Sequence, residues 1–234
     1  GVNTYTGTTT INAGTLQVGN ATTGSIASTS VVNNANLLYG TTVASGTFGL
    51  ANSTTGTGNL TATGKLLKLN GNITQSGNVS LTGSTATGLY ASGIELVNNT
   101  TITAGNITLT GDLGYRGAQA GNLILNTSAT NGAITINASV GRSSVWYGFS
   151  SFTANAGTGN LTVSGANLAS NWAVNAATLT GALNISSGFT SGGPLNLNAT
   201  GNSTIAGNLA LASSSTNTWS VNPNLTMTVS GHIS

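Results

Sequence analysis

A short alternation of apolar and small polar residues, bounded by Gly and Asn, recurs along the whole chain and limits what it can fold into. Examples are GNITQSG at 71–77, GNVSLTG at 77–83 and GNLTVSG at 159–165. Period-two alternation with β-branched residues and turn-forming boundaries predicts short strands. Apolar residues rarely recur at the three-to-four spacing of an amphipathic helix. We therefore expect an all-β chain.

The spacing of these segments favours a solenoid. Leu161, Leu183, Ile205 and Met227 follow one another at an equal interval, although other segments are closer together. Repeats of this length are typical of coils that bury their apolar face against the next coil. At about 20 residues per coil, we expect a single domain over 1–234, a parallel β-helix of roughly 11–12 coils. The alternative is an antiparallel sandwich, in which the Asn-Gly pairs at 70–71 and 131–132 would form hairpin turns.

The composition agrees with stacked coils. Thr, Gly, Asn and Ser supply 133 of the 234 residues, and only six side chains are charged. Like charges on adjacent coils would lie about 5 Å apart and repel each other. Thr, Ser and Asn can instead form hydrogen bonds to their counterparts above and below. Leu, Val, Ile and Phe supply 53 residues, enough for a core and too many for charge-driven disorder.

The same composition argues against several classes of function. Four Lys and Arg residues make no phosphate-binding patch, so we expect no nucleic acid partner. One Asp, one Glu, one His and no Cys predict no metal and no cofactor. No apolar run approaches the roughly 20 residues of a membrane span. We therefore expect no nucleic acid partner, no metal or cofactor, and no membrane span.

Residues 1–19, GVNTYTGTTTINAGTLQVG, carry the most specific motif. They resemble the passenger-associated strand repeat of bacterial autotransporters. The later segments that begin Gly-Asn are similar to the strand repeats of filamentous-haemagglutinin-type exoproteins. The resemblance implies a right-handed parallel β-helix exported to a bacterial surface, with roles in adhesion, aggregation and fibre or biofilm formation. Without an export signal or a C-terminal membrane barrel, we expect a stretch of passenger or a product cut from one.

The segment GRSSVWYGFSSF at 141–152 is the one compositional anomaly. It concentrates the candidate contact residues, which are Arg142, Trp146, Tyr147, Phe149 and Phe152. Exposed aromatic rings stack on sugars and anchor protein interfaces. We expect an assembly contact or a glycan contact here. The alternative is a longer loop that covers the side of the solenoid or fills a wide coil.

Glu95 and Asp112 are the only two acids, and the interval between them is about one coil. Two close carboxylates on adjacent coils would suit a polysaccharide-cleaving β-helix. The alternative is a local pair between Asp112 and Arg116, and we predict no catalytic residues. Lys65 and Lys68 are expected to be solvated on opposite faces of a strand. His232, near the end, is expected to be exposed.

Thr-x-Thr pairs raise the question of ice binding, which needs such pairs in a ladder on successive coils. Their intervals along the chain are irregular, so we predict no ladder. The pairs are Thr4/Thr6, Thr8/Thr10, Thr61/Thr63, Thr101/Thr103, Thr108/Thr110 and Thr226/Thr228.

These observations predict a non-enzymatic structural protein, located outside the cell or on a bacterial cell surface. A net charge of +2 gives little repulsion between copies, and strand-like pattern continues almost to both ends. We expect copies of the chain to stack end to end as a fibre or adhesive scaffold. The alternative is a monomeric adhesin segment that binds a surface glycan through the aromatic segment. Ice binding and polysaccharide cleavage are further alternatives.

Overall fold

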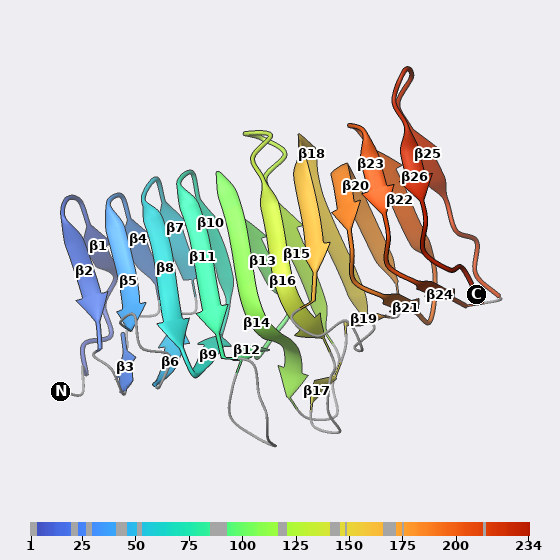
Figure 1. The fold of residues 1–234 in the computed structure, drawn as a ribbon. Helices are drawn as coiled ribbons and strands as arrows, with labels where there is room; N and C mark the ends of the chain where they lie inside the picture. The colour runs from blue at the N-terminus through green and yellow to red at the C-terminus, as the bar shows by residue number, and fades with distance from the viewer. Residues whose placement is uncertain are drawn as a thin grey trace.

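The computed structural model describes residues 4–19, 23–26, 30–40, 46–50, 53–84, 93–116, 121–140, 146–147, 149–165, 172–174, 176–212 and 214–234. These residues wind into a β-solenoid and contain no helix (Figure 1). Strands such as β2 run down the near side and strands such as β1 run up the far side, while the coil advances from N to C. This course is right-handed. The predicted fold class, a right-handed parallel β-helix, is confirmed.

The first column holds ten strand segments stacked in parallel, each paired with the equivalent segment one coil further on. Its members in order are β1 (Thr9–Ile11), β4 (Val31–Asn33), β7 (Ser53–Gly56), β10 (Asn72–Gln75), β13 (Thr100–Thr103), β15 (Asn122–Asn126), the first part of β18 (Ser151–Ser164), the first part of β20 (Ala177–Ile185), β22 (Leu195–Ala199) and β25 (Trp219–Val221).

The second column stacks beside it with the same continuity. It consists of β2 (Thr15–Val18), β5 (Asn36–Gly40), β8 (Asn59–Gly64), β11 (Asn78–Gly83), the first part of β14 (Asn106–Arg116), β16 (Ile134–Val140), the later parts of β18 and β20, β23 (Ser203–Ile205) and β26 (Met227–Val229).

The third column is less regular. Its first members are β3 (Thr23–Ser25), β6 (Thr47–Leu50), β9 (Leu66–Leu69), β12 (Gly93–Leu96) and the end of β14. The end of β14 also pairs in antiparallel fashion with β17 (Trp146–Tyr147). A separate parallel sheet follows, made of β19 (Trp172–Val174), β21 (Phe189–Ser191) and β24 (Leu209–Leu211).

The rod has ten coils in its longest column, so the expected 11–12 coils is corrected. Eight of the ten also place a parallel strand on the third side among the described residues. The first strand begins at Thr9 and the tenth at Trp219, which makes nine steps of about 23 residues each. A short step joins Leu179 to Leu197, whereas one of the longest follows Ile73. The expected period of about 20 residues is too short, because the steps from Asn78 to Asn106, from Ile107 to Ile134 and from Ile134 to Leu161 are 27 or 28 residues long.

The core is one continuous stack of inward side chains, as the period-two pattern predicts. Leu81 lies opposite Leu109 on the next coil, and Leu109 lies opposite Ile136. All three are buried, and their neighbours along each strand point outward. Burying apolar area in this way contributes about 25 cal/mol per Å². Each coil therefore depends on its neighbours for most of its stability.

The Gly-Asn pairs at 58–59, 77–78 and 105–106 mark the corner between the first and second columns. A Cβ at Gly105 would collide with the backbone oxygen of Ser76 one coil below, and a Cβ at Gly77 would collide with that of Gly58. Only glycine allows the backbones to approach this closely at the corner. The motif in the sequence is therefore a requirement of stacking.

Candidate functional site

Two rows of small polar side chains run along the outer surface of the second column. Each residue lies opposite its counterpart on the next coil, across five consecutive coils. We call these the hydroxyl rows. Row one is Thr61, Ser80, Thr108, Thr135 and Thr162, and row two is Thr63, Thr82, Thr110, Asn137 and Ser164.

The prediction that the Thr-x-Thr pairs form no ladder is therefore wrong for this surface. Thr61 and Thr108 are far apart in the sequence, with Ser80 between them at unequal intervals, yet all three align. Irregular intervals do not disturb the alignment because the extra residues fall in the connections between strands. The pairs were visible in the sequence, but their register became visible only in the fold.

The hydroxyls of these rows have almost no partners in the described part of the chain. Ser164 Oγ donates to Ile136 O at 3.5 Å, and no other side chain of the two rows forms a hydrogen bond to the described part of the chain. The expected bonds between counterparts above and below are absent from this described surface. Thr carries one hydroxyl on a short side chain, which here is left open to solvent by the described part of the chain.

The asparagines beside them behave differently, and there the expected ladder is confirmed. Asn59 Nδ2 donates to Asn36 Oδ1 at 3.3 Å, and Asn59 Oδ1 accepts from the backbone N–H of Asn78 at 2.9 Å. Asn106 Nδ2 donates to Asn78 Oδ1 at 2.8 Å, and Asn106 Oδ1 accepts from Ala133 N at 2.8 Å. This asparagine ladder (Asn36, Asn59, Asn78 and Asn106) ties successive coils together along the corner.

The aromatic segment is only partly a surface feature. Phe149 and Phe152 are buried and stacked with ring centroids 5.7 Å apart, and Tyr115 meets Phe149 edge-on at 6.0 Å. Burial leaves neither Phe ring open to a glycan or a second copy, so the contact predicted for these two is corrected to core packing. The physical reason is position: Phe152 falls on an inward position of β18, opposite Leu123.

The rest of that segment is described only in part. Trp146 and Tyr147 form β17, but their side chains lie outside the described residues, as does Arg142 altogether. Tyr115, which the sequence did not single out, connects Phe149 to the backbone near the start of the first-column strands β13 and β15. Its hydroxyl contacts the backbone oxygens of Asn98 and Asn122, both at 3.0 Å. Burial raises the pKa of Tyr115 to about 12.

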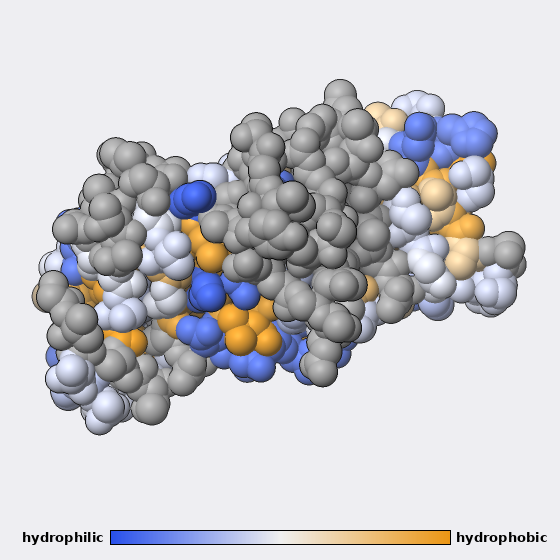
Figure 2. All heavy atoms as spheres, turned by 90° about the horizontal axis from the view of Figure 1, so that it is seen from below, coloured by the Kyte–Doolittle hydropathy of each residue, from blue (hydrophilic) through white to orange (hydrophobic). Residues whose placement is uncertain are grey.

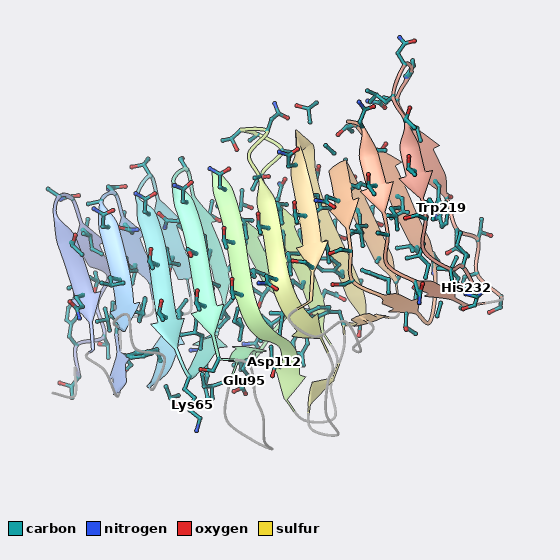
Figure 3. All side chains as sticks on the ribbon, in the orientation of Figure 1. Lys65, Glu95, Asp112, Trp219 and His232 are labelled. Atoms are coloured by element: carbon teal, nitrogen blue, oxygen red, sulfur yellow. The ribbon has the colours of Figure 1, made fainter. Side chains whose placement is uncertain are left out.

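Three charged side chains lie near one another on the third side of the rod, where Figure 3 shows Lys65, Glu95 and Asp112. Lys68 Nζ lies 3.7 Å from Glu95 Oε2 on the next coil. Asp112 is buried, two positions before the residue that faces Glu95. The two acids are thus on adjacent coils as the spacing suggested, but only Glu95 reaches the surface. The predicted local partner of Asp112, the Arg116 side chain, lies outside the described residues.

The remaining single residues have structural positions. Lys65 is exposed at the bend before β9, so it does not lie on the strand face opposite Lys68 as predicted. His232 is exposed, as expected, and its backbone N–H donates to Asn208 Oδ1 at 2.9 Å. Trp219 is half-buried against the core. Seen from below, the described part of the third side shows polar and apolar groups next to each other (Figure 2).

Within the described ranges, no three His, Asp or Glu side chains lie close enough together to hold a metal ion. No helix in the same part of the chain is long and apolar enough to cross a membrane. Comparison with known proteins found no matching family model, no matching curated protein and no matching solved structure.

Proposed function

We propose that this chain is a non-enzymatic extracellular structural protein, a fibre or adhesive scaffold subunit of a bacterial surface or biofilm matrix. The resemblance of residues 1–19 to an exported strand repeat supports the location. The observation that carries the proposal is the repetition of one nearly uncharged rung along the rod. Such a rod offers a long, uniform surface and a stable spacer.

Assembly of copies end to end would pair the strand edges of the two outermost described coils. Among the described residues, β1 and β2 pair only with β4 and β5, and β25 and β26 pair only with β22 and β23. Each of these strands keeps one edge of N–H and C=O groups without a neighbouring strand in the described part of the chain. An edge of this kind is a template for another strand.

Apolar side chains lie exposed at the last described coil. Val221 is 39% exposed and Ile233 is 47% exposed, whereas Leu197, opposite Trp219 one coil earlier, is buried. Stacking another rung on this coil would remove both side chains from water. A head-to-tail contact of this kind does not close on itself and gives a filament.

The surroundings of the two acids support the non-enzymatic part of the proposal. A glycosidase needs two carboxyl groups that flank one substrate bond. Glu95 is engaged by Lys68, and Asp112 is buried beneath the surface. Replacing Glu95 by Gln and assaying a panel of soluble polysaccharides tests this. Glycan cleavage that is lost in Glu95→Gln would contradict it.

Negative-stain electron microscopy of the purified chain in plain buffer tests assembly. We expect fibres whose width matches one solenoid, and we expect Val221→Lys together with Ile233→Lys to shorten them. Ile124→Lys is the matched control, because Ile124 is an exposed apolar residue in the middle of the first column. Discrete single rods from the unaltered chain would contradict assembly and would direct the search to the sides of the rod.

A further inference from the structure

We propose that the hydroxyl rows of the second column form an ice-binding surface, whose ligand is the ordered water lattice of an ice crystal. This inference does not depend on end-to-end assembly. Five consecutive coils present ten outward positions in register, of which nine are Thr or Ser and one is Asn137. The strands that hold them lie side by side on the near side of the rod in Figure 1.

The geometry of a parallel sheet sets the spacing of the rows. Counterparts on adjacent coils are separated by about 4.8 Å, and residues two apart on one strand by about 6.7 Å. Hexagonal ice repeats its oxygen positions on a comparable scale in two directions. A rigid array with this repeat can place many oxygens at lattice positions at once, which a single binding site cannot do.

The chemistry of the rows leaves them free for such a ligand. Apart from Ser164, their side chains form no hydrogen bond to the described part of the protein, which leaves these hydroxyls open to water there. Each Thr also carries a methyl group, which limits the directions from which water can approach. Water held in a regular pattern at these positions can join a growing ice lattice without rearrangement.

The asparagine ladder makes the surface rigid. Asn59, Asn78 and Asn106 each lie two residues before the row-one residue of the same strand. Their side-chain amides form hydrogen bonds between coils. The spacing of the rows is therefore fixed before any ligand binds. Pre-organisation of this kind lowers the entropy cost of binding.

Other occupants fit this surface less well. The hydroxyl rows contain no charged side chain, and the described ion pair lies on the third side. The rows therefore have no charge that could bind a charged mineral surface. The rows hold no aromatic ring on which a sugar could stack.

The test uses the unaltered chain and two variants in an ice-partition assay, with thermal hysteresis as a second readout. Fluorescently labelled protein is exposed to a slowly growing ice surface, and the fractions in ice and liquid are measured. We expect the unaltered chain to enter the ice and to shape single crystals. Thr108→Tyr, at the middle of row one, should lower the ice-bound fraction at least fivefold.

Thr103→Tyr is the matched control, because Thr103 is an outward Thr of the same coil on the first column. It should leave partition unchanged. If Thr108→Tyr loses its β-sheet circular dichroism, Thr82→Lys replaces it, with Thr74→Lys as its control on the first column of that coil. Exclusion of the unaltered chain from ice would overturn the proposal. Equal partition of a row variant, its control and the unaltered chain would overturn it too.

Discussion

The first two columns and the third side of the rod follow different rules. Along the first two columns, strands stay paired with their counterparts over ten coils. The corner between the two columns is short where β10 ends at Gln75 and β11 begins at Asn78. The return across the third side varies widely: it is short from Asn59 to Asn72 and much longer from Asn78 to Thr101. Differences in coil length are thus absorbed mostly on the third side, and in smaller part at the corner, which is longer from Leu125 to Ile134 and shorter from Leu179 to Leu183. The other two sides can keep a regular array on a chain whose repeats are irregular.

The largest expected effect tests the difference between inward and outward positions within one strand. Leu109→Ala removes a buried side chain from the stack between Leu81 and Ile136 and should cost about 2–5 kcal/mol of unfolding free energy. Thr108→Ala, one residue earlier and outward, should cost less than about 0.5 kcal/mol. Urea unfolding followed by circular dichroism measures both. Equal losses would contradict the assigned inward and outward positions.

An insertion tests the two sides directly. Four residues, Gly-Ser-Gly-Ser, placed between Ser76 and Gly77 would displace corner bonds such as Ser76 N to Gly56 O and Gly105 N to Gly77 O. At about 1 kcal/mol for each lost bond, we expect a loss of roughly 2–4 kcal/mol. The same insert after Ser84, in the connection between β11 and β12, should cost less than about 1 kcal/mol. The reverse order would refute the comparison.

A smaller effect separates the asparagine ladder from the hydroxyl rows. Asn59→Ala removes one bond to Asn36 and one from the N–H of Asn78, and it should cost about 1 kcal/mol because water replaces part of the loss. Thr61→Ala, two residues later in row one, should be nearly neutral, since its hydroxyl has no partner in the described part of the chain. Chemical unfolding compares the two. A larger loss for Thr61→Ala would contradict the contrast.

The smallest effect concerns the ion pair on the third side. Lys68 is 41% exposed at its side chain, so water screens its attraction to Glu95. A double-mutant cycle with Lys68→Met and Glu95→Gln should give a coupling of less than about 1 kcal/mol that weakens with added salt. A coupling several times larger would mean that the pair fixes the register of β9 and β12.

The sequence was sufficient to predict the strands, the parallel coils and the polar ladder at Asn59 and Asn78, because these depend on local pattern and on Gly beside Asn. It was insufficient for the number of coils, because the length of each return is not encoded in the strand pattern. The sequence also left open whether Phe149 and Phe152 lie on the surface or fill a coil, and the fold shows both buried. Their segment reads as an aromatic surface loop, and only pairing of β15 with β18 shows which side of the strand Phe152 takes.

The candidate surface shows the same limit. Thr61 and Thr108 were recognised as members of Thr-x-Thr pairs, but nothing in their sequence positions shows that Ser80 aligns between them. Alignment is a property of three-dimensional register, which depends on where the intervening residues are accommodated. Sequence reasoning found the chemical groups of this surface and missed their order.

Pulsed electron paramagnetic resonance on two spin-labelled pairs tests the central claim, that the second column keeps one register along the rod. The chain has no Cys, so Thr61→Cys with Thr228→Cys and Thr108→Cys with Thr228→Cys can be labelled without side reactions. The first pair is separated by seven coil steps and the second by five. At about 4.8 Å per step we expect backbone separations of roughly 34 Å and roughly 24 Å, and narrow distributions. Separations that fail to differ by about 10 Å, the length of two steps, or broad distributions for both pairs, would contradict the account.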